Sequence, residues 1–248
     1  MRISKYIAAA ALLILPAVAE AQTRAKFEQE VAVGVVSGMN MSQVRFLHND
    51  LTSENQIGDI KWRHGATIGV AGRYIAQKHF GIQLEVNYLQ GGWKDKFQET
   101  ATANGISFAG AETDGKLDYM SIPLLAHIYF GNKARFFVNV GPKIGFLMKC
   151  EREYEFTEEQ FELINSTNPN DPRINDSIEE KKTDYGICIG GGFEWHAKHI
   201  DLFAEARWTY GLQDVYPHDK KDVFQRTNNQ NISLCVGVLL PVVKFHSN

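Results

Sequence analysis

The stretch from Thr183 to Leu212 constrains the fold most, because its side chains alternate with a period of two residues. One stripe is apolar and largely aromatic, while the opposite stripe consists mainly of small and charged residues. A period of two is that of a β-strand, whose successive side chains leave opposite faces of the sheet. The segment from Ala197 to His199 interrupts the alternation and predicts a tight turn, so the stretch is expected to form an antiparallel hairpin.

The same alternation recurs in six further segments, which brings the expected number of strands to about eight. These segments are residues 30–39, 66–76, 80–88, 116–130, 135–148 and 231–243. Pro123 and Pro142 fall inside two of them. Because proline removes a donor from the hydrogen-bond ladder, a bulge or a kink is expected at each.

The connections between these segments alternate between long and short. The long ones cover residues 41–64, 91–115, 150–182 and 213–229. Within the third, the run Thr157-Glu158-Glu159-Gln160 matches a capping box and predicts a short helix that ends near Asn165. Bacterial outer-membrane barrels have an even number of antiparallel strands, with short turns on the periplasmic side and long loops outside. The pattern therefore predicts an all-β, eight-stranded antiparallel transmembrane β-barrel with both termini in the periplasm.

The first 21 residues have the composition of a secretory signal peptide. Arg2 and Lys5 are positive, the segment from Ile7 to Leu15 is apolar, and Ala19-Glu20-Ala21 is a small-x-small cleavage motif. The apolar run is shorter than the ~20 residues of a spanning helix. We therefore expect cleavage after residue 21, and a single barrel domain over residues 22–248.

The small and charged stripe is expected to face the lumen of the barrel. An eight-stranded barrel is only wide enough to be filled by side chains, and small residues fit such a space. Charges of both signs on this stripe are expected to neutralise one another, because a lone buried charge is costly. The residues of this lumen charge network are Arg73, Glu85, Lys143, Glu194, Glu205 and Arg207. Either they form a structural ion-pair core, the interpretation we favour, or they line a polar pathway.

Aromatic residues near the strand ends indicate that lipid surrounds the barrel. Such residues form girdles at the two membrane interfaces. The expected girdle consists of Tyr74, Tyr88, Trp195, Trp208 and Tyr210. The rival fold is a soluble barrel or sandwich of lipocalin type, in which the apolar stripe would face inward. The glycine content of the opposite stripe argues against that fold.

Several runs of the mature chain resemble the PorT-like outer-membrane β-barrel family of the Bacteroidetes. They are Leu84-Glu85-Val86-Asn87-Tyr88 with Gly91-Gly92, Tyr119-Met120-Ser121-Ile122-Pro123-Leu124-Leu125, Val140-Gly141-Pro142 and Glu205-Ala206-Arg207-Trp208-Thr209-Tyr210-Gly211-Leu212. The resemblance implies an integral outer-membrane barrel. The named member of that family belongs to the type IX secretion apparatus, so the resemblance also implies a part in protein export.

No motif for catalysis or cofactor binding stands out. The chain has no Gly-x-Ser-x-Gly and no phosphate-binding glycine loop, and Ser121 and His127 are too far apart on one strand to touch. His196 and His199 flank a turn, but their spacing is not that of a metal site. No catalytic, cofactor or metal site is therefore expected. The three cysteines, Cys150, Cys188 and Cys235, are interpreted as structural thiols.

The leading functional hypothesis is a non-enzymatic component of protein export across the outer membrane. One alternative is a small porin-like or structural barrel, and another is a lipid-modifying barrel enzyme. The expected partners are outer-membrane lipid and, through the long loops, other proteins of a secretion apparatus. A net charge of −3 gives no sign of a nucleic-acid partner.

Overall fold

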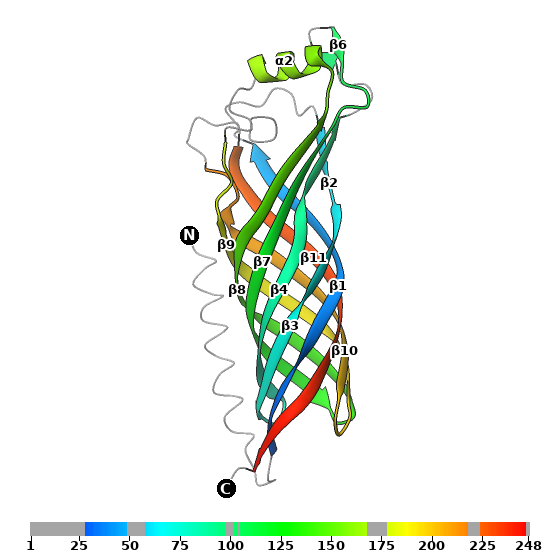
Figure 1. Cartoon of the computed structure of the whole chain (residues 1–248), viewed down its shortest axis with the longest axis vertical. Helices are drawn as coiled ribbons and strands as arrows, with labels where there is room; N and C mark the ends of the chain where they lie inside the picture. The colour runs from blue at the N-terminus through cyan, green and yellow to red at the C-terminus, as the bar shows by residue number, and fades with distance from the viewer. Residues whose placement is uncertain are drawn as a thin grey trace.

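The computed structural model describes residues 28–48, 58–97, 102–103, 105–167, 178–217 and 224–246. Within these ranges the chain is almost entirely β-structure, and the strands wind around a common axis as a tall barrel (Figure 1). The expected signal peptide lies outside the described residues. In the described part of the chain, no helix combines the length and the apolar character that a membrane span requires.

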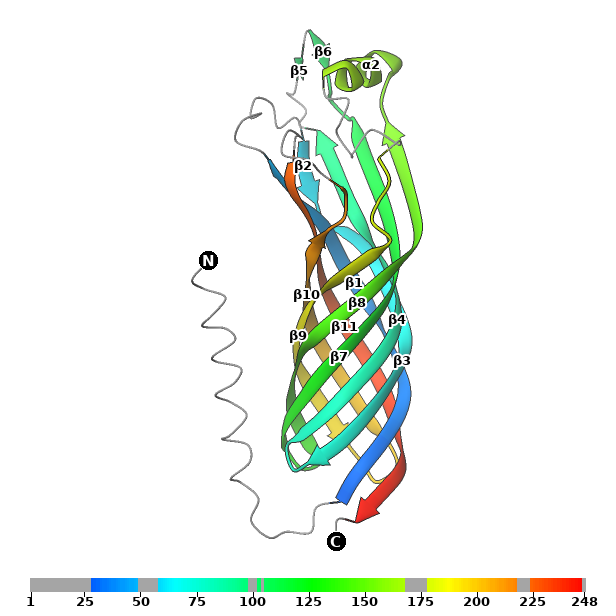
Figure 2. The same ribbon diagram turned by 90° about the vertical axis from the view of Figure 1, so that its left-hand side faces the viewer.

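Eight long strands form a closed antiparallel ring, as the sequence predicts. Each pairs with its neighbours along the chain, and the ring closes where the first strand meets the last. The eight strands are β1 (Glu28–His48), β3 (Arg63–Gln77), β4 (Phe80–Phe97), β7 (Glu112–Gly131), β8 (Ala134–Glu155), β9 (Thr183–His196), β10 (Asp201–Asp214) and β11 (Phe224–His246). The start of β1 and the end of β11 lie together at the lower end of the barrel (Figure 2).

Among the described residues, two short strand pairings and one helix lie at the upper end of the barrel. Strand β2 (Gly58–Lys61) pairs with the end of β4, and β5 (Thr102–Ala103) pairs with β6 (Ile106–Ser107). Helix α2 (Glu158–Thr167) lies beside β6 above the barrel (Figure 2). The predicted capping box is present, because Thr157 and Gln160 exchange side-chain to backbone hydrogen bonds of 2.9 and 3.3 Å. Gln160 also donates to the carbonyl of Ser107, which fixes the helix on β6.

The strands extend much further at the upper end than the apolar alternation predicts. Strand β1 continues to His48, β4 to Phe97 and β8 to Glu155, through segments expected to be loops. The physical reason is an inversion of polarity. In the upper part many inward side chains are apolar, such as Val44, Trp93 and Leu117, and most outward ones are charged. Asp95 and Thr113 are also buried there, so the upper interior is mixed. The alternation is still present there, but in the opposite sense.

The expected bulges at the prolines are absent. Pro123 pairs with Lys143 and Ala126 pairs with Val140, so the β7–β8 register is the same on both sides of Pro123 and Pro142. The ladder is interrupted between these two pairs instead, so no extra residue is needed to accommodate the missing donors. The register shift of this strand pair lies further up, between Asp118 and Tyr119.

Candidate functional site

The lumen of the barrel is filled by side chains in successive layers. Near the lower end an apolar layer contains Phe137, Phe203 and Leu239. Charged side chains fill the middle, and a second apolar cluster fills the upper end. All six charged residues predicted for the lumen are buried in this arrangement: Arg73, Glu85, Lys143, Glu194, Glu205 and Arg207.

The guanidinium of Arg207 is the centre of the middle layer. It donates to both carboxylate oxygens of Glu85 at 2.7 Å, and to both oxygens of Glu205 at 2.9 and 3.0 Å. Asn87 and Asn139 complete the shell by donating to Glu85 and Glu205 at 2.7 and 3.1 Å. We call Glu85, Glu205 and Arg207 the central network. Bidentate pairs of this kind are the strong form of a buried ion pair.

A glycine on the neighbouring strand provides the room for this network. A Cβ added at Gly190 would lie 2.1 Å from Oε1 of Glu205. Gly190 is on the lumen stripe of β9, directly paired with Arg207 of β10. The glycine-rich stripe seen in the sequence therefore has a specific use here, which is to let a carboxylate lie flat against the wall.

A second network lies one layer below. Glu194 accepts from Arg73 and, at 3.0 Å, from Arg135. Arg73 also lies over the ring of Phe203. We call Arg73, Arg135 and Glu194 the periplasmic network. Arg135 was not predicted, although its position two residues before Phe137 places it on the lumen stripe.

A glutamine joins the two networks. Arg73 donates to Gln83 at 2.7 Å, and Gln83 in turn donates to Glu85 at 2.5 Å. One network holds two carboxylates and one guanidinium, and the other holds two guanidinium groups and one carboxylate. Their formal charges of −1 and +1 cancel across this bridge. Neutrality explains how six ionised groups can be buried together.

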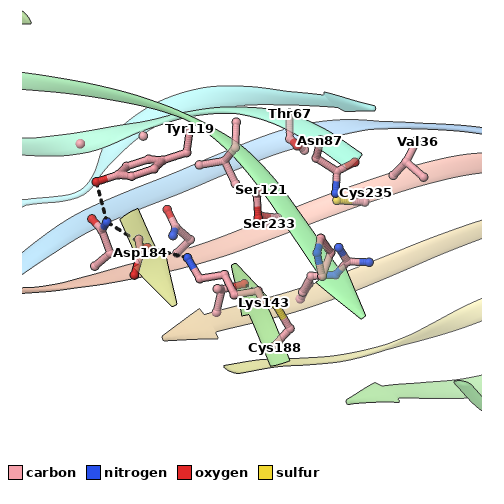
Figure 3. A pocket seen from close by; sticks show the side chains of 18 residues that line it. Val36, Thr67, Asn87, Tyr119, Ser121, Lys143, Asp184, Cys188, Ser233 and Cys235 are labelled. Atoms are coloured by element: carbon pink, nitrogen blue, oxygen red, sulfur yellow. Dashed lines mark hydrogen bonds and ion pairs between the residues drawn. The ribbon is translucent and has the colours of Figure 1, made fainter. Parts of the chain in front are cut away.

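Lys143 belongs to a separate pair nearer the upper end. It lies 2.7 Å from Asp184, which the sequence places on the lumen stripe but which the predicted network omits. Asn229 donates to Asp184 and to the hydroxyl of Tyr119 at 3.2 and 3.1 Å. Figure 3 shows Tyr119, Lys143 and Asp184 converging from different strands of the wall.

A small open space borders this pair. It is a cavity of about 30 Å³, lined by Lys143, Asp184, Ser121 and Ser233, among others (Figure 3). One water molecule needs roughly 10–15 Å³ measured in this way, so the cavity has room for about two. Buried oxygens of Asn87 and Asp184 have no hydrogen-bond partner among the described residues. They are suitable partners for such waters.

The upper apolar cluster closes the lumen above the cavity. Trp93 donates to the hydroxyl of Tyr216 at 3.2 Å, and Phe46 contacts both rings at centroid distances of 5.6 and 6.1 Å. The guanidinium of Arg152 lies 5.6 Å from the Tyr216 ring centroid. Burial, with the nearby carboxylate of Glu180, raises the pKa of the Tyr216 phenol. We call Phe46, Trp93 and Tyr216 the extracellular cap.

The predicted aromatic girdle residues all lie on the outer face. Tyr74 and Trp195 are exposed near the lower turns. Tyr88 is exposed near the upper end of the apolar face. Trp208 and Tyr210 are half-buried on the outer face of β10, and their rings stack at a centroid distance of 5.8 Å. From Tyr185 to Trp195, a span of ten residue steps, the outward residues of β9 are apolar. At a tilt of about 40°, ten residues give roughly 25 Å of height, which is that of the apolar band of an outer-membrane barrel.

Ser121 and His127 both face the lumen, and the ring of His127 bonds Asn139 at 2.8 Å rather than a nucleophile. Cys150, Cys188 and Cys235 form no disulfide among the described residues, and the last two are buried.

A sequence model of a protein family described as "Outer membrane protein beta-barrel domain" matches residues 20–216. Solved structures with a similar course of the chain include Neisserial surface protein A, with 12% identity, a TM-score of 0.44, and coverage of 88% of this chain and 100% of that one. OprG from Pseudomonas aeruginosa has 8% identity and a TM-score of 0.42, with coverage of 89% and 96%. Ail of Yersinia pestis has 11% identity and a TM-score of 0.37, with coverage of 85% and 99%. No curated protein matches the sequence.

Proposed function

This chain belongs to the outer membrane protein beta-barrel domain family. From its filled lumen we propose that it is a closed, non-enzymatic barrel that supports a folded surface outside the cell. The family places it in the outer membrane as an integral protein, where lipid contacts the apolar face of its strands. The proposal concerns what the barrel does there.

The observation that carries the proposal is the filled lumen. The periplasmic network, the central network and the extracellular cap block the axis at three levels. The cavity between the last two has room for about two waters and is not a channel. An eight-stranded wall leaves no wider path around these groups.

Conductance across a planar lipid bilayer tests this proposal. The purified barrel is expected to insert without producing resolved current steps, because ions would have to displace buried, hydrogen-bonded charges. A general porin reconstituted in the same bilayer is the positive control for the recording. Discrete, reproducible current steps from the wild-type protein would contradict the closed-barrel proposal.

A second candidate is a role in protein export, of the kind implied by the resemblance to the PorT-like family. The structural support for this role is the ordered part of the barrel that extends above the apolar band. Strands β7 and β8 continue upward as a paired ladder, and helix α2 is fixed on β6 by the Gln160–Ser107 hydrogen bond. An ordered extracellular surface is suited to binding a partner protein.

Comparing the secreted proteins of strains with and without the gene tests this second candidate. If the protein takes part in export, its loss depletes specific proteins from the medium and retains them in the periplasm. Complementation with a chain that lacks residues 157–167 then asks whether α2 is needed, provided that the shortened barrel still reaches the membrane. An unchanged secreted fraction in the deletion strain would eliminate the export role and leave the closed structural barrel.

A further inference from the structure

Three potential metal ligands come together at the periplasmic mouth of the barrel. Glu30 is on β1, His196 ends β9 and Asp201 begins β10. One side-chain ligand atom from each lies within 4.8 Å of the other two. Both carboxylate residues are buried, with exposed fractions of 6% and 2%, while His196 is half-buried. Solvent can therefore reach the imidazole side of the cluster, but the carboxylates lie against the wall.

The backbone holds these residues in place. His196 and Asp201 are directly paired across the β9–β10 hairpin, and Nδ1 of the imidazole lies 2.6 Å from a carboxylate oxygen of Asp201. The amide of His196 donates to the carbonyl of Lys133 at 2.7 Å, which ties this hairpin to the turn between β7 and β8. Glu30 reaches the cluster from the barrel's first strand.

The charges of the cluster do not balance when the imidazole is neutral. Two carboxylates face one ammonium, that of Lys244, which lies 3.0 Å from Glu30 and has a side chain that is 38% exposed. The two guanidinium groups of the periplasmic network are paired with Glu194. Because two nearby carboxylates repel each other, the position between them favours additional positive charge.

We propose that Glu30, His196 and Asp201 bind a divalent transition-metal ion, with Zn²⁺ as the best match to a donor set of two carboxylates and one imidazole. Ligands of tetrahedral zinc lie about 2.0–2.2 Å from the ion, and hence roughly 3.4 Å from one another. The three donors need to adjust by about an ångström to reach that arrangement. Lys244 must turn toward water, which its exposure permits. The sequence missed this site because Glu30 is far from the histidine in the chain.

Such an ion would cross-link the first strand of the barrel to its β9–β10 hairpin. Anything that binds only the folded state stabilises it, by about 2.7 kcal/mol at a concentration one hundred times Kd. Metal binding is therefore expected to raise the thermal unfolding temperature of the barrel. The effect is independent of whether the lumen conducts or the protein takes part in export.

Titration calorimetry with ZnCl₂ tests the proposal on the full mature barrel, refolded in detergent, freed of its purification tag and treated with a chelator. One ion is expected to bind per chain. His196→Ala is expected to weaken binding at least about tenfold. His199→Ala is the matched control, because His199 is an exposed imidazole in the same turn, and it should bind as the wild type does. Lys244→Met is expected to bind more tightly, because it removes the competing cation.

Thermal unfolding followed by circular dichroism provides a second measurement for any variant whose folding is in doubt. Zn²⁺ is expected to raise the unfolding temperature of the wild type and of His199→Ala, but not of His196→Ala or Glu30→Gln. Ca²⁺ at the same concentration should have no such effect, because it prefers oxygen ligands alone. No zinc binding by the wild type would overturn the proposal. Equal binding by the wild type and His196→Ala, or loss of binding in His199→Ala, would do the same.

Discussion

Arg207 and Glu85 face each other across the lumen, 122 residues apart in the chain and joined by two hydrogen bonds of 2.7 Å. They come from β10 and β4, which are not neighbours in the ring. This pair is therefore a contact across the barrel rather than along its wall. Glu205 shares the same guanidinium, so removing Arg207 would leave two buried carboxylates without their cationic partner.

Arg207→Met is accordingly expected to destabilise the barrel by about 3–5 kcal/mol, because it leaves uncompensated buried charge. Urea unfolding in lipid vesicles, followed by tryptophan fluorescence, measures the loss. The triple variant Arg207→Met, Glu85→Met, Glu205→Met is expected to be more stable than the single one, because no charge remains buried in the central network. A single variant as stable as the wild type would show that this network contributes little.

Two adjacent glycines on β9 allow a matched test of the space beside the central network. In Gly190→Ala the new Cβ would lie 2.1 Å from Glu205, whereas in Gly191→Ala it would lie 3.6 Å from its nearest neighbour. The first variant is expected to lose about 1–3 kcal/mol through overpacking, and the second to change little. Equilibrium unfolding of both variants under the same conditions gives the comparison. Equal stabilities would mean that Glu205 moves aside at no cost.

The buried phenol of Tyr216 in the extracellular cap leads to a prediction about the stability of the barrel at alkaline pH. Burial raises the pKa of Tyr216, so its neutral form is favoured in the folded state. The stability that follows from this shift is present below the ordinary tyrosine pKa of about 10, and is lost as the pH rises above that value. Tyr216→Phe should remove one late-titrating phenol from an absorbance titration, and should cost about 1 kcal/mol at neutral pH through the lost Trp93 hydrogen bond. An unchanged titration curve would contradict the assignment.

A pair of substitutions on the outer face of β7 tests where lipid ends. Leu124 is exposed within the apolar band, and Lys116 is on the same face above it. Leu124→Lys is expected to cost about 2–4 kcal/mol, as for a charge on the lipid face near the midplane. Lys116→Leu loses only a surface ion pair with Glu153 and should cost less than about 1 kcal/mol. Similar costs at the two positions would place the membrane boundary elsewhere.

The fold could be predicted from the sequence because lipid and a narrow lumen impose opposite demands on alternate residues. The outward stripes containing Leu84 and Ile189 carry that signal, and the family match supports the membrane barrel. The strand extensions were not predicted, because the prediction relied on an apolar outer face, and that face becomes charged above the membrane. The alternation is present in these extensions, but the prediction wrongly required its outward residues to be apolar.

The buried site could be predicted only in part. Alternation indicates which charges face the lumen, and so identifies Arg207 and Glu205. It does not indicate how far each strand is shifted against its neighbour, which decides the partners. Arg135 and Asp184 are on the predicted stripe but near strand ends, where the sequence cannot distinguish the lumen from the solvent. Gln83 links the two networks because of the heights at which their side chains lie along the barrel axis. The sequence does not give these heights.

The change of polarity along β7 has a consequence for how the protein is held at one depth. Between Asp118 and Met120 the outward residues pass from charged to apolar, and between Tyr119 and Ser121 the inward ones pass from aromatic to polar. A shift of the barrel along the membrane normal would move charged side chains into hydrocarbon at one end and expose apolar side chains to water at the other. The change of polarity along the strands therefore fixes the depth at which the barrel lies in the membrane. In the upper part Trp93 and Leu117 pack inside and charged residues lie outside, so packing within the bilayer would put those charges in hydrocarbon. We therefore expect this part to complete its packing after it has crossed the membrane.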